Sequence, residues 1–163
     1  MKIIATTIAG LALAATGVVG AAGAASPAMQ SSVPVQIRHQ TAGCHTWSAN
    51  GSPFRAALSL TLARGGKLTI TDNDVMPHQL VRLSGPRVAY SLVSPGSMMG
   101  GSMMGTLKAP YASGMMPHIG AALRVTFARA GVYTFKTVAG EDYMQGVKTT
   151  GADNVLKLVV TVR

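Results

Sequence analysis

The chain has 163 residues, which suits a single domain, and its formal net charge is +9. Its Lys and Arg residues are scattered singly, so the charge does not predict a nucleic-acid site. The sequence contains no Gly-rich phosphate loop, no Cys-x-x-Cys pair and no Ser/His/Asp set in a recognisable context, which argues against nucleotide or hydrolytic chemistry. We therefore expect a binding protein and not an enzyme. The scattered basic residues favour a solubilising surface, with docking of an acidic partner protein as the alternative.

Residues 1–24 are predicted to be a secretory signal peptide. Lys2 precedes an uncharged apolar run over residues 3–19, and Ala22-Gly23-Ala24 fits the small-x-small pattern that signal peptidase cuts. The run is short for a membrane anchor and contains Gly and Thr, so cleavage is favoured. We expect a mature protein that is periplasmic or secreted, with no membrane span after cleavage.

The next segment, residues 25–57, is expected to hold a flexible N-terminal stretch and a first strand, ahead of a folded domain over residues 58–163. It contains Cys44, the only cysteine of the chain. A single cysteine in an exported protein has no partner for an internal disulfide. Cys44 is therefore a metal ligand, an intermolecular pairing site or an inert buried group.

Short strands separated by turns account for most of the remaining chain. Apolar and polar residues alternate in several stretches, and β-branched residues are frequent there, as in half-buried strands. The predicted strands are residues 33–37, 58–62, 67–71, 79–83, 87–93, 123–127, 132–138 and 156–162. About eight strands in one small domain predict an all-β sandwich.

Two glycine-containing turns, at residues 63–66 and 128–131, predict tight reversals at one end of this sandwich. The neighbouring loops then belong to the opposite end. The segments predicted at that opposite end are residues 40–55, 72–78, 118–120 and 139–151. All four His, nine of the ten Met and four of the five acidic residues fall in or near these segments or in the flexible start of the mature chain, so we expect a site at this end.

The segment at residues 71–81, which reads TDNDVMPHQLV, resembles the first ligand loop of the cupredoxins, the blue-copper protein family. Residues 131–144 resemble the last hairpin and ligand loop of that family. The resemblance covers roughly residues 58–162 and implies a cupredoxin-like Greek-key β-sandwich of about eight strands with copper as cofactor. It places His78 at the first His ligand and Met144 at an axial position.

The last loop departs from the family pattern. Lys136 stands where the family has its Cys ligand, and Glu141 stands where it has a second His. A blue electron-transfer site needs a His-His-Cys set, so that site does not carry over. Cys44 and His45 are candidate replacements from the same end. Glu141 is a candidate ligand for Cu(II) or a harder ion, or else a solvated acid.

Methionine-rich segments suggest soft ligands. Residues 97–105 contain the tandem repeat Ser-Met-Met-Gly, and Met115-Met116-Pro117-His118 repeats the Met-Pro-His of residues 76–78. Thioethers suit Cu(I), and imidazole suits either copper state, so His118 is a further candidate ligand. The alternative is an adaptable apolar loop that contacts a partner protein.

Two other acids of the 72–78 loop, Asp72 and Asp74, are expected to have a structural role. Asp side chains commonly accept hydrogen bonds from backbone amides within a turn. We therefore do not place either carboxylate among the predicted ligands.

Three hypotheses for function follow. The first is a copper-binding protein for copper handling or tolerance. The second is an electron-transfer protein in which Cys44 rebuilds a Cys/His/Met copper site. The third is a metal-free interaction module. The residues predicted to bind the metal are His78, Cys44, His45, Met144, Glu141 and His118.

Overall fold

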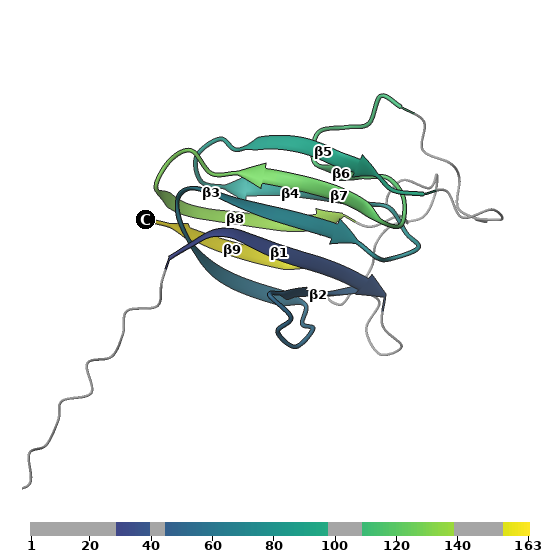
Figure 1. Cartoon of the computed structure of the whole chain (residues 1–163), viewed down its shortest axis with the longest axis horizontal. Coiled ribbons are helices and arrows are strands. Elements are labelled where there is room, and N and C mark those ends of the chain that lie inside the picture. The colour runs from purple at the N-terminus through teal and green to yellow at the C-terminus, as the bar shows by residue number, and fades with distance from the viewer. Residues whose placement is uncertain (1–28, 40–44, 98–108, 139–154) are drawn as a thin grey trace, which may run out of the picture.

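The computed structural model describes residues 29–39, 45–97, 109–138 and 155–163. These residues form nine strands, which Figure 1 labels. None of them forms a helix with the length and hydropathy needed to cross a lipid bilayer. The strands are β1 (Gln30–His39), β2 (His45–Ala49), β3 (Ala57–Asp72), β4 (His78–Ser84), β5 (Ala89–Pro95), β6 (Met115–Met116), β7 (Ala121–Thr126), β8 (Gly131–Val138) and β9 (Lys157–Val162).

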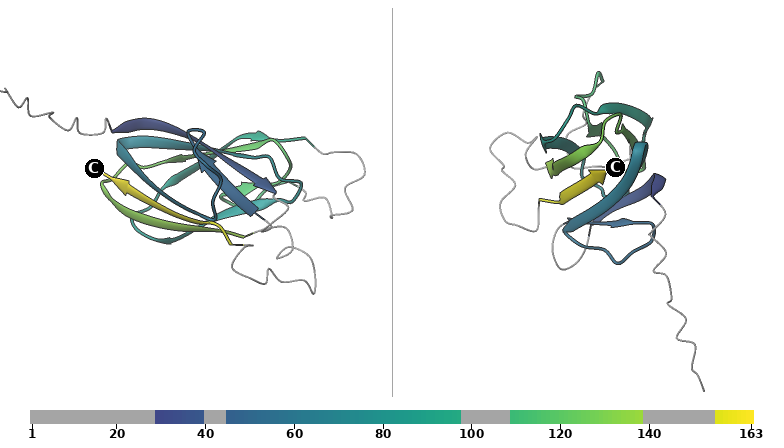
Figure 2. Two further views of the ribbon diagram at one scale, coloured as in Figure 1. Left: turned by 90° about the horizontal axis from the view of Figure 1, so that it is seen from below. Right: turned by 90° about the vertical axis from the view of Figure 1, so that its left-hand side faces the viewer.

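The strands are hydrogen-bonded in the order β2-β1-β3-β9-β8-β4-β6, with β7 paired to β3 and β5 paired to β7. Strand β3 belongs to two layers because its halves have different neighbours. Residues 57–62 run parallel to β9, whereas residues 67–72 lie between β1 and β7. One layer is therefore β3-β9-β8-β4-β6, and the other is β2-β1-β3-β7-β5. Figure 2 shows the strands arranged around a common interior, so the predicted all-β sandwich is confirmed.

The chain reverses direction in the middle of β3. Leu62 pairs with Val162 at one end of the sandwich, whereas Asp72 lies at the other end, opposite Ala121. The reversal passes through Gly65, whose φ of 79° suits glycine. The two arms separate into different layers because both edges of residues 67–72 are already occupied by β1 and β7.

Side chains from alternate positions fill the interior. The inward-facing residues of β1 are Val33, Val35 and Ile37, and all three are fully buried or nearly so. At the end where the β3 reversal lies, the interior is aromatic, with Phe127 and Tyr133 ring centroids 4.9 Å apart. We call this end of the sandwich the aromatic end.

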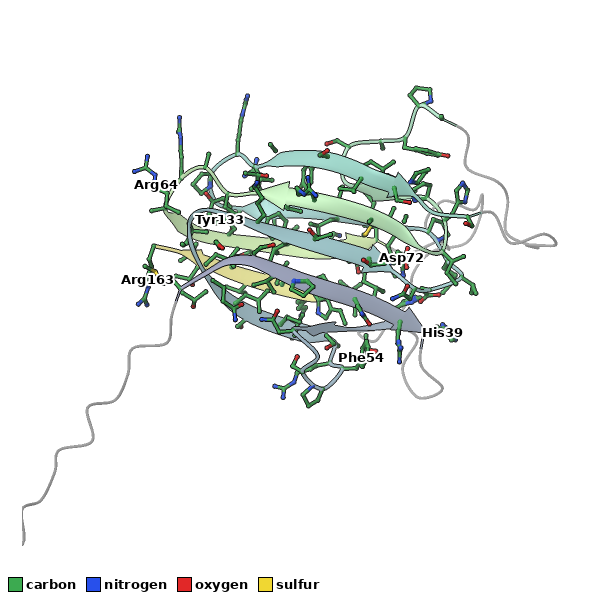
Figure 3. The ribbon with its side chains drawn as sticks, viewed as in Figure 1. His39, Phe54, Arg64, Asp72, Tyr133 and Arg163 are labelled. Carbon is green, nitrogen blue, oxygen red and sulfur yellow. The ribbon has the colours of Figure 1, made fainter. Side chains whose placement is uncertain are left out.

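The opposite end of the interior is polar. Figure 3 shows His39 and Asp72 at this end, and Tyr133 and Arg163 toward the other. The buried polar or charged residues that reach it from the strand ends and the 72–78 loop are His45, Asp72, Asp74, His78 and Thr137. We call this end the histidine end. It is the end at which the sequence predicted a site.

Candidate metal centre

Two of the histidines come from the β1–β2 pair. His39 and His45 are direct partners across these antiparallel strands, so their side chains lie on the same face. That face is the inward one, because His39 continues the alternation of Val35 and Ile37. The His45 side chain is fully buried, whereas the His39 side chain is 52% exposed. The two ring centroids are 5.9 Å apart.

The loop between β3 and β4 is shaped by two aspartates. The Asp74 amide donates to Asp72 Oδ1 at 3.0 Å, and the Met76 amide donates to Asp74 Oδ1 at 3.1 Å. These are the side-chain to backbone hydrogen bonds that the sequence predicted for both residues. They fix the Asp74 carboxylate in place and use only one of its oxygens.

The second oxygen of Asp74 is surrounded by imidazole nitrogens. His45 Nδ1 donates a hydrogen bond to Asp74 Oδ2 at 2.7 Å. His78 Nε2 lies 3.5 Å from the same oxygen, and His39 Nδ1 lies 3.9 Å from it. The rings of His45 and His78 are nearly perpendicular, with centroids 4.7 Å apart. Three histidines from separate strands thus converge on one buried carboxylate oxygen.

The surroundings shift the pKa values of Asp72 and Asp74 in opposite directions. Burial alone would raise the pKa of Asp74, but hydrogen bonds from His45, His78 and the Met76 amide outweigh it and hold that pKa well below its usual range. Burial raises the pKa of Asp72, and the neighbouring negative charge of Asp74 raises it further. The site therefore holds one strongly favoured negative charge, on Asp74.

This donor set fits a transition-metal ion. His39, His45 and Asp74 each offer one ligand atom, and these three atoms all lie within 4.8 Å of one another. Ligand atoms that share one ion at about 2.0–2.1 Å lie roughly 3 Å apart, so small movements would bring this set together. In addition, His45 Nε2 is buried and has no hydrogen-bond partner among the described residues. Imidazole and carboxylate donors suit copper, zinc, nickel and iron.

The predicted ligands fall into three groups. His78 and His45 both lie beside Asp74, as described above. His118 has a different neighbour, because its Nε2 lies 3.4 Å from the Tyr111 hydroxyl and its ring packs edge-on against the Tyr111 ring. Cys44, Glu141 and Met144 lie outside the described residues, as does the Ser-Met-Met-Gly repeat, and their metal roles stay predictions.

Two residues of the cluster, His39 and Asp74, were not among the predicted ligands. His39 had a usable signal, because it continues an inward alternation and lies only six residues before His45. Asp74 had no such signal, because a role in the turn already explains an aspartate at this position. Only the folded structure shows that histidines surround its second oxygen.

No protein-family model and no curated protein matches this sequence. Among solved structures, a Cu(I) structure of a mutant amicyanin is 15% identical with a TM-score of 0.36, covering 80% of this chain and 93% of that one. A multi-copper oxidase from Pediococcus acidilactici is 8% identical with a TM-score of 0.36, covering 97% of this chain and 29% of that one. A cysteine protease inhibitor from Entamoeba histolytica is 16% identical with a TM-score of 0.38, covering 66% and 85%. All of these TM-scores lie below 0.5, so function has to be argued from the site itself.

Proposed function

We propose that the mature protein binds copper at the histidine end and acts in copper handling or tolerance outside the cytoplasmic membrane. The ligands in this proposal are the imidazoles of His39, His45 and His78, with Asp74 as their carboxylate partner. The observation that carries it is that three histidines gather around Asp74 Oδ2, with nitrogen–oxygen distances of 2.7, 3.5 and 3.9 Å, while His45 Nε2 is buried without a hydrogen-bond partner among the described residues. The half-exposed His39 provides the route by which an ion enters.

A cluster held together only by ion pairing explains this arrangement less well. One histidine is enough to satisfy a carboxylate oxygen, and His45 already does so at 2.7 Å. A buried polar atom without a partner costs about 1–3 kcal/mol, and His45 Nε2 has none among the described residues. A carboxylate that accepts from one imidazole nitrogen while the other binds metal is a common arrangement in metalloproteins. We therefore assign His45 Nε2 to the metal and Nδ1 to Asp74.

Copper is favoured among the metals that imidazole binds. For nitrogen and oxygen donors, the affinity of divalent first-row ions rises from manganese to copper and falls again at zinc. Imidazole also binds copper in its reduced state, Cu(I), whereas zinc has no reduced state in proteins. Zinc is the competitor that the experiment has to include.

The test is a titration of the purified mature protein with Cu(II) and with Zn(II), each against a competing chelator. We expect one tight copper equivalent and weaker zinc binding. Copper affinity should fall more than about 100-fold in His45→Ala and in His78→Ala. Loss of a residue that only orients a ligand costs about 10–100-fold, and each of these changes removes a ligand itself. The matched control is His118→Ala, since His118 pairs with Tyr111 and should leave copper affinity unchanged.

Far-ultraviolet circular dichroism of each variant shows whether the fold is kept. Folded His45→Ala and His78→Ala proteins that bind copper as tightly as wild type would overturn the proposed site. A wild-type protein that takes up no copper would overturn the proposed function and favour a metal-free interaction module.

A further inference from the structure

Strand β6 places a methionine directly against one of the proposed ligands. Strands β4 and β6, labelled in Figure 1, form an antiparallel pair. In this pair Met116 lies opposite His78, and Met115 lies opposite Gln79. Direct partners in an antiparallel pair project to the same face, with Cβ atoms about 4.5–5.5 Å apart. The side chains of His78 and Met116 are both fully buried, so the thioether and the imidazole share the interior of the histidine end.

The backbone around β6 fixes this register. The Leu80 amide donates to the Gly114 carbonyl at 2.9 Å, and the Gln79 side chain donates to the Ser113 carbonyl at 3.1 Å. Gly114 has a φ of 79°, and a Cβ there would lie 2.5 Å from the Leu80 carbonyl oxygen. Only glycine permits so close an approach of the two segments. The short strand is therefore held in one position, and Met116 with it.

The donor chemistry at Met116 differs from that of the histidines. A thioether is neutral and soft and favours Cu(I), whereas imidazole accepts either copper state. Methionine has three rotatable side-chain bonds, so its sulfur can reach beyond its strand partner without movement of the backbone. Packing alone does not require a methionine at position 116, because a leucine side chain fills a similar volume.

We propose that Met116 is a thioether donor that makes this site retain copper as Cu(I). This inference rests on the copper site proposed above, since it names the oxidation state that the site selects and the residue that selects it.

The test compares Met116→Leu with Met115→Leu. Successive residues of a strand project to opposite faces, so Met115 faces away from His78 although it too is buried. For Met116→Leu we expect Cu(I) affinity, measured against a Cu(I)-specific chelator, to fall at least about tenfold with Cu(II) affinity nearly unchanged. A tenfold selective loss of Cu(I) lowers the copper reduction potential by about 59 mV. Met115→Leu should behave as wild type in all of these measurements.

X-ray absorption of the Cu(I) form gives an independent readout. A sulfur scatterer that disappears in Met116→Leu and persists in Met115→Leu would support the assignment. Equal Cu(I) affinity in wild type and Met116→Leu, with copper still bound, would overturn the role of Met116 and leave the proposed copper site standing. No copper binding by the wild-type protein would overturn both.

Discussion

The two ends of the interior are both built from buried side chains, but those side chains are chemically opposite. At the aromatic end, Phe127, Tyr133 and Phe135 pack with ring centroids 4.9–6.5 Å apart, and the Tyr133 hydroxyl donates to the Arg129 carbonyl. At the histidine end, His45 and Asp74 are as deeply buried as those rings. Burial of apolar surface stabilises a fold, whereas burial of polar and charged groups lowers stability unless each is paired.

This difference separates two tasks within one small domain. The aromatic end stabilises the sandwich, and the histidine end is built from groups that stabilise it poorly. Natural proteins depart from consistent apolar packing mainly where function requires it. The buried polar end is therefore the place where a ligand is expected, and four changes test that contrast.

The largest effect is expected at the aromatic end, from Phe127→Ala. Removal of a fully buried phenylalanine lowers the free energy of unfolding by about 3–5 kcal/mol. Urea denaturation of the metal-free protein measures the loss, and a copper titration of the folded variant should give wild-type stoichiometry. A loss below about 1 kcal/mol, or a lost copper site in folded protein, would contradict the division between the two ends.

Copper should stabilise the histidine end. An ion that binds only the folded state adds about 2.7 kcal/mol to the free energy of unfolding when its free concentration is roughly 100 times Kd. The measurement is urea denaturation with and without copper. In His45→Ala the gain from copper should vanish, whatever the stability of the metal-free variant. An equal gain in both proteins would place the copper elsewhere.

Asp74→Asn should weaken copper binding without removing a ligand. Loss of a carboxylate that orients a ligating histidine lowers metal affinity by about 10–100-fold. Asp72→Asn is the matched control, because an amide oxygen can still accept from the Asp74 amide. A chelator competition assay measures both, and equal affinities in the two variants would show that Asp74 does not position His45.

The smallest effect concerns the pH dependence of the metal-free protein. Burial, aided by the charge of Asp74, raises the pKa of Asp72. The Asp72 carboxyl therefore binds its proton more tightly in the folded state than in the unfolded state. The free energy of unfolding should therefore fall as pH rises above about 4, the unfolded pKa of an aspartate, and Asp72→Asn should lessen this fall. Asp74 acts oppositely, because its lowered pKa stabilises the fold above about pH 4 and the effect fades at lower pH. Urea midpoints of wild type and Asp72→Asn across this range measure the difference, and parallel curves would contradict a buried, proton-retaining Asp72.

Alternation of apolar and polar residues was enough to predict the longer strands and the end at which the loops gather. It did not predict β2, because all five of its residues are buried and no alternation appears in the sequence. It also did not predict β6, which has two residues and exists only through its pairing with β4. The turn at Gly65 was predicted, whereas the separation of its two arms into different layers depends on β1 and β7.

Part of the cluster around Asp74 was predictable from the sequence, whereas its function as a metal site stays a prediction. His78 and His45 could be named from motif and position, and Asp74 could be given its role in the turn. Its role toward the three histidines could not be predicted, because they reach it from β1, β2 and β4, which only the assembled fold brings together.

Because β3 is divided between two layers, the residues proposed to bind copper come from both layers. His39 and His45 belong to the β1–β2 layer, whereas His78 and Met116 belong to the layer that contains β4 and β6. An ion held by both pairs would cross-link the layers at the end opposite the β3 reversal. In a chain with a single cysteine, such an ion would do what an internal disulfide does, because it would bind the folded state and join two distant strands.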